Sequence, residues 1–365
     1  MTEKQGGSDV RANTSTATPS VRGGPGSEYR LEGHKWFTSA PMCDAFLVLA
    51  YAPKGMSCFL VPRVLPDGTR NSLRFMRLKD KLGNRSNASA ELEFDCTAAW
   101  MIGEEGRGIP TIIEMVHATR LDVANWGVSL MRQAVSQAGW HVANREAFGA
   151  TLIDKPLMQN VLADLEIEVE AATLMITRLS GAHERMEVDE REQAFARLAT
   201  PVAKYWLTKQ SNPVVREALE CVGGNGYVED SIMPRLYREA PLNAIWEGAG
   251  NVIALDIGRA AARNPESVKI FLDELEQSRG RDAGIDKHLD ALRADFANPL
   301  FEGDARRLVE KLAVTWAATL MVEYGHPSVS DAYLMSRVGG DHGSLFGTLP
   351  TSCDLDQISR RAVPA

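Results

Sequence analysis

The sequence predicts an α+β fold in which a β domain is followed by a helical bundle and then by a helical extension. Residues 29–102 contain short apolar runs separated by turn signals, which is typical of strands. From residue 106 onward, apolar residues recur at three- and four-residue spacing, which indicates helices. Asn264-Pro265 breaks this pattern before about a hundred further residues of helical sequence. The expected domains are 1–105, 106–262 and 263–365.

The strands are indicated by composition and by turns. Residues 45–51 and 57–63 are rich in strand-forming side chains, and Pro53-Lys-Gly55 between them is a hairpin signal. Pro66-Asp-Gly68 marks a second turn. Ser89–Asp95 alternates with period two, as expected for a strand with one buried face.

The helices are expected at 109–144, 156–186, 191–222 and 249–262. Asp189 precedes the third helix as a helix start should, and Gly223-Gly224 follow it as a helix stop should. The residues from Gly339 onward, about the last 25, are rich in Gly, Ser, Thr and Asp, so we expect this end to be loose.

Composition excludes several classes of protein. The 365 residues carry a net charge of −8, which argues against a general binder of nucleic acid or membrane surfaces. The five cysteines are far apart, which is typical of reduced thiols in a cytoplasmic protein. The histidines show no metal-binding spacing, and no apolar run is long enough to span a bilayer.

The sharpest local motif is Trp246-Glu-Gly-Ala-Gly-Asn251. A carboxylate near a helix N-terminus can simply cap the helix and interact with its dipole. Alternatively, Trp246 shields the Glu247 carboxylate from water so that it acts as a base, while the glycines let a substrate approach the backbone. The motif alone leaves both interpretations open.

Other polar and glycine-rich stretches also have two interpretations. Leu219–Tyr227 is either the stop of an amphipathic helix or a place where bare backbone N–H groups meet a phosphate or a flat ring. It does not fit GxGxxG and follows a helix, so a Rossmann site is not indicated. Arg145-Glu-Ala-Phe-Gly149 ends a helix with a cation, which is usual there. Residues 2–9, TEKQGGSD, form a polar turn.

The order of these motifs is more specific than any one of them. TEKQGGSD, GHKWFTS, KDKLGNRSNAS, IGEEGRG, NREAFG, ECVGGNGY and RLYREAPLNAIWEGAGN follow one another as in the acyl-CoA dehydrogenases, which the chain resembles over residues 1 to about 262. SCFLVPRVLPDGTRNSLRF and PRLYREAPLNAIWEG look most like the AidB-like, alkylation-response branch of that family. This branch adds a helical extension, which fits residues 263–365.

The resemblance implies a reaction and a base. The family uses FAD to oxidise the Cα–Cβ bond of an acyl-CoA thioester, and a carboxylate takes the α-proton. Glu247 matches the position of that catalytic base, and its backbone N–H would assist at the thioester oxygen. The resemblance also implies an electron-transferring flavoprotein as electron acceptor.

The same resemblance implies which residues bind FAD. They are Thr2, Gly7 and Ser8; Trp36, Phe37 and Thr38; Arg145 and Phe148; Gly223, Gly224 and Asn225; and Ala249 and Asn251. The first group would contact the flavin from one side, and the second would pack beside its ring. The third and fourth match positions that reach the FAD of a neighbouring subunit, which implies a homo-oligomer, a tetramer in most relatives.

Three departures from the family pattern bear on activity. Ala249 replaces a Thr whose hydroxyl meets the pyrophosphate in common dehydrogenases. The turn before Trp36 is shorter than usual. The sequence also begins at a position that follows an N-terminal helical domain in the family, so we expect a misplaced start or a fragment, with weak FAD binding and poor turnover.

The AidB-like relatives also bind duplex DNA through their C-terminal helices. Between Arg263 and the end there are twelve Lys and Arg against sixteen Asp and Glu, which is the wrong sign for a phosphate-binding face. Arg306, Arg307 and Lys311 could form a small basic stripe, or a solvated helix face. A DNA-associated protection flavoprotein with vestigial dehydrogenase activity, or an inactive fragment, are therefore the alternatives to an acyl-CoA dehydrogenase.

Overall fold

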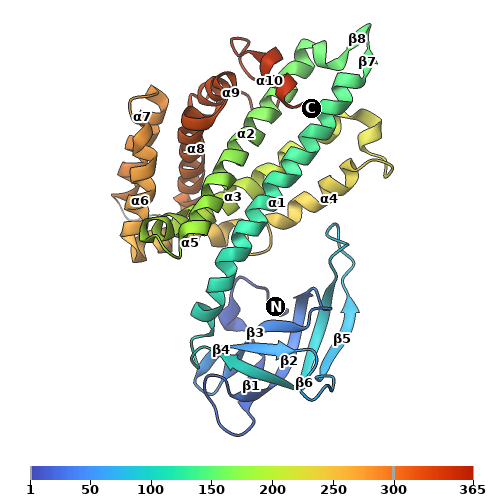
Figure 1. The fold of residues 1–365 in the computed structure, drawn as a ribbon, viewed down its shortest axis with the longest axis vertical. Helices are drawn as coiled ribbons and strands as arrows, with labels where there is room; N and C mark the ends of the chain where they lie inside the picture. Colours follow the sequence, from blue (N-terminus) through green and yellow to red (C-terminus); the bar gives the residue numbers. More distant parts are fainter. Residues whose placement is uncertain (1, 298–300, 365) are drawn as a thin grey trace. The chain divides into compact units, whose positions relative to one another are not determined.

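The computed structural model describes residues 2–297 and 301–364, which form two compact units, Met1–Thr119 and Arg120–Ala365 (Figure 1). Each unit is described by itself. The first unit contains the sheet, and the second contains the helical bundle together with the extension. The bundle and the extension share one hydrophobic core, which runs from Ala124 to Ala362.

The first unit is built on one mainly antiparallel sheet that closes on itself. Its strands are β1 (Thr16–Pro19), β2 (Glu28–Ser39), β3 (Ala45–Ala52), β4 (Gly55–Pro62), β5 (Leu73–Leu78) and β6 (Ser89–Ile102). The order is β2-β1-β3-β4-β6-β5, and β6 also pairs with β2, so five strands form a closed ring with β5 beside β6 (Figure 1). Only the short β1–β3 pairing is parallel.

The core of this unit follows from alternation along the strands. β3 and β4 pair from Ala45↔Pro62 to Ala52↔Gly55, which confirms the hairpin predicted at Pro53–Gly55. Val48, Phe59 and Leu92 are fully buried inside the closed sheet. β-branched and aromatic side chains pack well on such a pleated surface, so the sheet forms where these residues alternate.

The second unit is helical apart from a two-stranded hairpin. The helices are α1 (Gly108–Asn144), α2 (Pro156–Arg185), α3 (Glu190–Cys221), α4 (Met233–Asn243), α5 (Gly250–Arg263), α6 (Pro265–Leu275), α7 (Ala283–Phe296), α8 (Ala305–Tyr324), α9 (Pro327–Tyr333) and α10 (Leu355–Arg361). The hairpin consists of β7 (Glu146–Ala147) and β8 (Ala150–Thr151). Helix α1 begins in the first unit and continues into this one.

The helix boundaries follow the signals in the sequence. The Asp189 carboxylate accepts hydrogen bonds from the N–H groups of Arg191 and Glu192, so it caps α3 as expected. After α3 the chain turns through a short 3-10 segment, Gly223–Gly226, in which Gly223 has a φ of 64°. That left-handed conformation costs glycine little, which is why the helix ends there.

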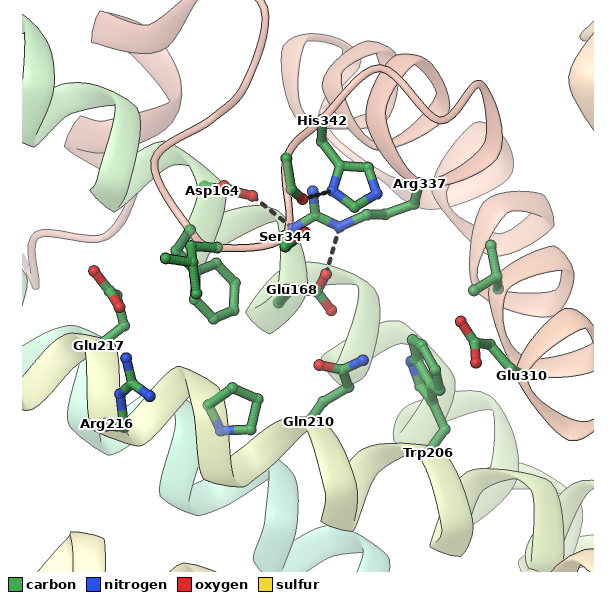
Figure 2. A pocket seen from close by; sticks show the side chains of 15 residues that line it. Asp164, Glu168, Trp206, Gln210, Arg216, Glu217, Glu310, Arg337, His342 and Ser344 are labelled. Atoms are coloured by element: carbon green, nitrogen blue, oxygen red, sulfur yellow. Dashed lines mark hydrogen bonds and ion pairs between the residues drawn. The ribbon is translucent and has the colours of Figure 1, made fainter. Parts of the chain in front are cut away.

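One aromatic cluster and one charged cluster hold the extension to the bundle. Phe195 of α3, Phe271 of α6 and Trp316 of α8 are buried together, with ring centroids 5.4–5.7 Å apart. Arg337, which follows α9, forms 2.6 Å ion pairs with Asp164 and Glu168 of α2 (Figure 2). Both carboxylates are almost fully buried, so either one would be costly to bury without the guanidinium.

The C-terminal segment is ordered in the residues described, which end at 364, so the expectation of a loose end was wrong there. Leu355–Arg361 form α10, whose Ile358 is fully buried against the core. Before it, the Leu349 N–H donates to Asn160 Oδ1, and the Asn160 amide donates to the Leu349 carbonyl. Gly-rich composition indicated mobility, but a few buried apolar side chains and these paired bonds order the segment.

Candidate functional site

The Trp246–Asn251 motif forms the connection between α4 and α5, and its backbone is unusual. Glu247 has a φ of 54° and Gly248 a φ of 101°, so two consecutive residues are left-handed. For glutamate this conformation costs on the order of 1–3 kcal/mol. Such strain persists only where surrounding contacts impose it, and it is most often found at functional sites.

Two cations hold the carbonyl groups of this strained turn. Arg120 of α1 donates from Nε to the Glu247 carbonyl at 3.1 Å, and its Nη2 lies 3.2 Å from Asp256 Oδ2. Lys204 of α3 donates to the Gly248 carbonyl at 2.6 Å. Sequence reasoning missed both residues, because they lie 127 and 44 positions from their partners.

Lys204 is only 1% exposed. Burial and the neighbouring Arg120 lower the pKa of Lys204 to about 7, although the Glu247 carboxylate acts in the opposite direction. No ion pair within 4 Å of Lys204 occurs in residues 2–297 and 301–364, so the Gly248 carbonyl is the contact that holds its ammonium. Its position fixes the turn that carries Glu247.

Trp246, the residue before Glu247, packs against a second tryptophan. The Trp246 ring lies 5.6 Å from that of Trp126 in α1, and its Nε1 donates to Asn243 Oδ1 at 3.2 Å. Glu247 itself is partly buried. Trp126 is 47% exposed, so this tryptophan pair is open to water.

Helix α5 begins directly after this turn, with Ala249 as its N-cap. Arg306 of α8 donates from Nε to Asn251 Oδ1 at 2.8 Å, so the extension reaches the predicted FAD residues. Arg306 is one member of the basic stripe expected on α8. Lys311, another member, pairs with Asp295 at 2.5 Å, so these two cations have different partners.

In the first unit, the structure brings two predicted FAD groups together. The carbonyl of Thr2 accepts hydrogen bonds from the N–H groups of Trp36 at 2.7 Å and Phe37 at 3.1 Å, and the Thr2 N–H donates to the Phe37 carbonyl. This contact occurs where the register of β2 against β6 shifts between Lys35 and Thr38. The TEKQGGSD turn and the GHKWFTS strand are therefore neighbours.

The side chains at this junction differ in exposure and in their partners. The Thr38 hydroxyl is buried and has no hydrogen-bond partner among the described residues. The Trp36 ring is covered by Lys79, whose Nζ lies 3.1 Å from the ring centroid, while Phe37 is 44% exposed. Gly7 leaves room for Thr2, whose Oγ1 would lie 3.1 Å from a Cβ at that position. Ser8 is exposed.

A buried ion pair that the sequence did not predict anchors the TEKQGGSD turn. Glu3 and Lys35 form a 2.6 Å pair with both side chains almost fully buried, and Lys35 also donates to the Leu49 carbonyl. Burial raises the pKa of Glu3, but hydrogen bonds from Lys35 and Thr14 outweigh it and lower the pKa to about 2. The only signal was a lysine in an otherwise strand-like run.

The remaining predicted FAD residues lie on exposed turns of the second unit. Arg145 directly precedes the β7–β8 hairpin, and Phe148 lies in its turn, with a φ of 53° and 94% exposure. Gly223, Gly224 and Asn225 are exposed on the short 3-10 segment after α3. A large aromatic side chain held in a strained turn without burial is typical of a residue that contacts another molecule.

Comparison with known proteins decides the family. The profile described as "Acyl-CoA dehydrogenase, middle domain" matches residues 1–97, and the profile described as "Acyl-CoA dehydrogenase, C-terminal domain" matches residues 106–262. The chain belongs to the acyl-CoA dehydrogenase family. This confirms the predicted family and the α+β fold class.

Three relatives illustrate the range of similarity within and around the acyl-CoA dehydrogenases. AidB of Escherichia coli (strain K12) is 43% identical over 91% of this chain and 60% of its own length. The crystal structure of Caenorhabditis elegans ACDH-11 in complex with C11-CoA has a TM-score of 0.79 at 29% identity, covering 99% of this chain and 63% of that one. A Bacillus anthracis acyl-CoA dehydrogenase complexed with FAD shares the fold at 17% identity, with a TM-score of 0.79, covering 99% of this chain and 73% of that one.

The chain thus spans about 60% of the length of AidB and of ACDH-11. No helix among residues 2–297 and 301–364 is long and apolar enough to cross a membrane. In the same ranges, no three His, Cys, Asp or Glu side chains come together as a metal site.

Proposed function

We propose that this chain acts as an FAD-dependent acyl-CoA dehydrogenase, in which Glu247 removes the α-proton of an acyl-CoA thioester. The observation that carries the proposal is the left-handed turn at Glu247 and Gly248, held by Arg120 and Lys204. A strained backbone at the one carboxylate that the family motif marks as the base supports a catalytic role better than a capping role, because a helix cap needs no such strain.

The residues present fit FAD. The buried Thr38 hydroxyl without a partner, beside Trp36, offers a hydrogen bond to a ring ligand in the first unit. Thr2, Gly7, Ser8 and Phe37 would complete this group. In the second unit, Ala249 and Asn251 stand at the N-terminus of a fourteen-residue helix, which favours an anion such as a phosphate. When bound, FAD supplies the acceptor for the β-hydride of the substrate.

The chain's own residues would then do the following. Glu247 takes the α-proton, which is weakly acidic in a thioester, and general bases of this kind contribute about 10²–10⁴-fold in rate. The Glu247 N–H supports the thioester oxygen as negative charge develops there. Trp246 packs against Trp126 directly before the turn that carries Glu247. Arg120 and Lys204 position the turn through its carbonyl groups.

The partners proposed here come from the family. They are an acyl-CoA substrate, an electron-transferring flavoprotein as acceptor, and further copies of this chain, which Arg145, Phe148, Gly223, Gly224 and Asn225 would contact through a neighbouring FAD. Duplex DNA is not part of the proposal, because the extension carries more acids than bases and Lys311 is paired with Asp295.

Anaerobic titration of the FAD-loaded chain with acyl-CoAs of graded length tests this function. We expect the visible absorbance of the oxidised flavin to bleach with at least one acyl-CoA. Replacement of Glu247 with Gln should abolish bleaching while FAD stays bound. If no acyl-CoA bleaches the bound flavin, the proposed function is wrong; if Glu247→Gln bleaches as fast as the unmodified chain, the base assignment is wrong.

A further inference from the structure

Two cations meet at the start of α5 without a carboxylate between them. A methyl group built on the α-carbon of Gly250 would lie 3.0 Å from Lys209 Nζ and 3.5 Å from Arg306 Nη2. Lys209 comes from α3 and Arg306 from α8, so the chain brings together positions 97 residues apart. In the part of the chain that the structure describes, neither forms an ion pair with Asp or Glu.

This arrangement costs free energy unless an anion is present. Like charges at close range repel, and the effect is visible in the second unit because burial and the neighbouring Arg306 lower the pKa of Lys209. Each cation otherwise has only a weak partner. Arg306 donates Nε to the neutral Asn251 amide at 2.8 Å, and Lys209 lies 5.3 Å from the Tyr205 ring centroid. The Nη side of the Arg306 guanidinium and the Lys209 ammonium are left for a ligand.

The surrounding backbone adds to the same preference. Helix α5 has fourteen residues, and its first N–H groups begin at Gly250, which has no side chain to fill the space between the cations. A helix N-terminus adds positive potential, but the two side-chain charges are the main attraction for an anion and the helix adds to it. The fork of an arginine and the point charge of a lysine together suit the several oxygens of a diphosphate.

The reach of the chain selects among diphosphates. Glu247 and Asn251 are four residues apart, which spans at most about 14 Å of extended chain. If Glu247 works at the Cα of a substrate on the flavin ring, the flavin's own diphosphate is the phosphate nearest to that point, because only the ribityl chain separates the two. The longer pantetheine arm places the phosphates of CoA farther from its thioester.

We propose that Lys209 and Arg306 bind the diphosphate of FAD, so that the helical extension completes the cofactor site of the dehydrogenase core. The proposal rests on the function proposed above. It assigns the extension a role in cofactor selection: a dinucleotide is bound through its diphosphate, and a flavin without phosphate gains nothing from these two residues.

Flavin binding to the full chain tests this assignment, by titration calorimetry with FAD and with riboflavin. Arg306→Gln and Lys209→Gln should each weaken FAD binding by about tenfold or more, since a charge-assisted hydrogen bond contributes about 1.5–3 kcal/mol. Riboflavin binding should not change. Arg307→Gln and Lys287→Gln, which change exposed cations without an ion pair among the described residues, are the matched controls, and Arg306→Lys should restore part of the affinity.

Several outcomes would overturn the proposal. FAD and riboflavin affinities that fall together in Arg306→Gln would show that the residue supports the fold rather than a phosphate. An unchanged FAD affinity with a weakened CoA affinity would assign the cations to the substrate. If the unmodified chain binds neither flavin, the proposed function fails, and binding of inorganic pyrophosphate then tests the cation pair alone. Pyrophosphate binding that is lost in both variants would show that the two cations form an anion site. No pyrophosphate binding by the unmodified chain would show that they do not.

Discussion

Single residues in this protein are held in positions that their neighbours in sequence do not explain. Glu247 adopts a left-handed backbone because Arg120 and Lys204 bind the carbonyl groups on its turn. The motif around Glu247 could be recognised from the sequence, since its letters are contiguous. The two cations could not, because only the fold brings them to the turn.

Lys204 gives a prediction about pH. Its pKa is about 7 in the folded chain and 10.5 ordinarily, so between these values the unfolded chain binds more protons and stability rises with pH. We expect Lys204→Met to remove this part of the rise between pH 7 and 9, measured as the free energy of unfolding in urea. Lys287→Met, at an exposed position, should keep it. Parallel pH profiles for Lys204→Met and the unmodified chain would contradict the assignment.

Glu3 gives a second prediction about pH, in a more acidic range, where stability again rises with pH. Its pKa is lowered from 4.5 to about 2, so its stabilising contribution is full above pH 4.5 and is lost as the pH falls toward 2. We expect Glu3→Gln to leave buried Lys35 unpaired and to cost about 3–5 kcal/mol near neutral pH. The loss should shrink in acid. The double variant Glu3→Gln, Lys35→Met should recover much of the stability; an equal loss in the single and double variants would show that the pair is not the cause.

At the scale of elements, periodicity and caps predicted what local sequence controls. Helices α1, α2, α3 and α5 begin and end within two residues of expectation, because each carries its own apolar stripe and stop signals. Helix α4 was not predicted, since it contains Pro234 and Pro241. Its proline at the first turn is compatible with a helix, but the pattern around it gives no clear period.

Helix α10 shows how tertiary contacts override composition. Ile358 is fully buried against the core, so Ile358→Ala should lower the free energy of unfolding of the second unit by about 2–5 kcal/mol. Leu345→Ala, in the same C-terminal segment but 68% exposed, should have little effect. Thermal or urea unfolding followed by circular dichroism measures both. Similar small losses for the two variants would mean that α10 is not docked in solution.

At the scale of the whole molecule, the order of motifs carried more information than any property of the chain as a whole. Seven short motifs identified the family, because so many motifs in the same order are improbable by chance. The sequence could not predict which site residues contact one another. Thr2 beside Phe37 and Arg306 beside Asn251 are juxtapositions that packing alone creates.

The β unit contains residues predicted to bind the flavin, and the helical unit contains the proposed base and the proposed phosphate-binding cations. Arg306 links the extension to this chemistry through Asn251. The extension is therefore an integral part of the second unit, because it shares a core with the bundle and its Arg306 contacts the motif that contains Glu247.

The most direct test of the central claim is exchange of the α-hydrogen of an acyl-CoA with deuterium from D₂O, followed by NMR on the FAD-loaded chain. This measurement isolates proton removal from the later redox step. We expect exchange by the unmodified chain and a loss of at least about 100-fold in Glu247→Gln with FAD still bound. Undiminished exchange in Glu247→Gln would contradict the role of Glu247 as the base.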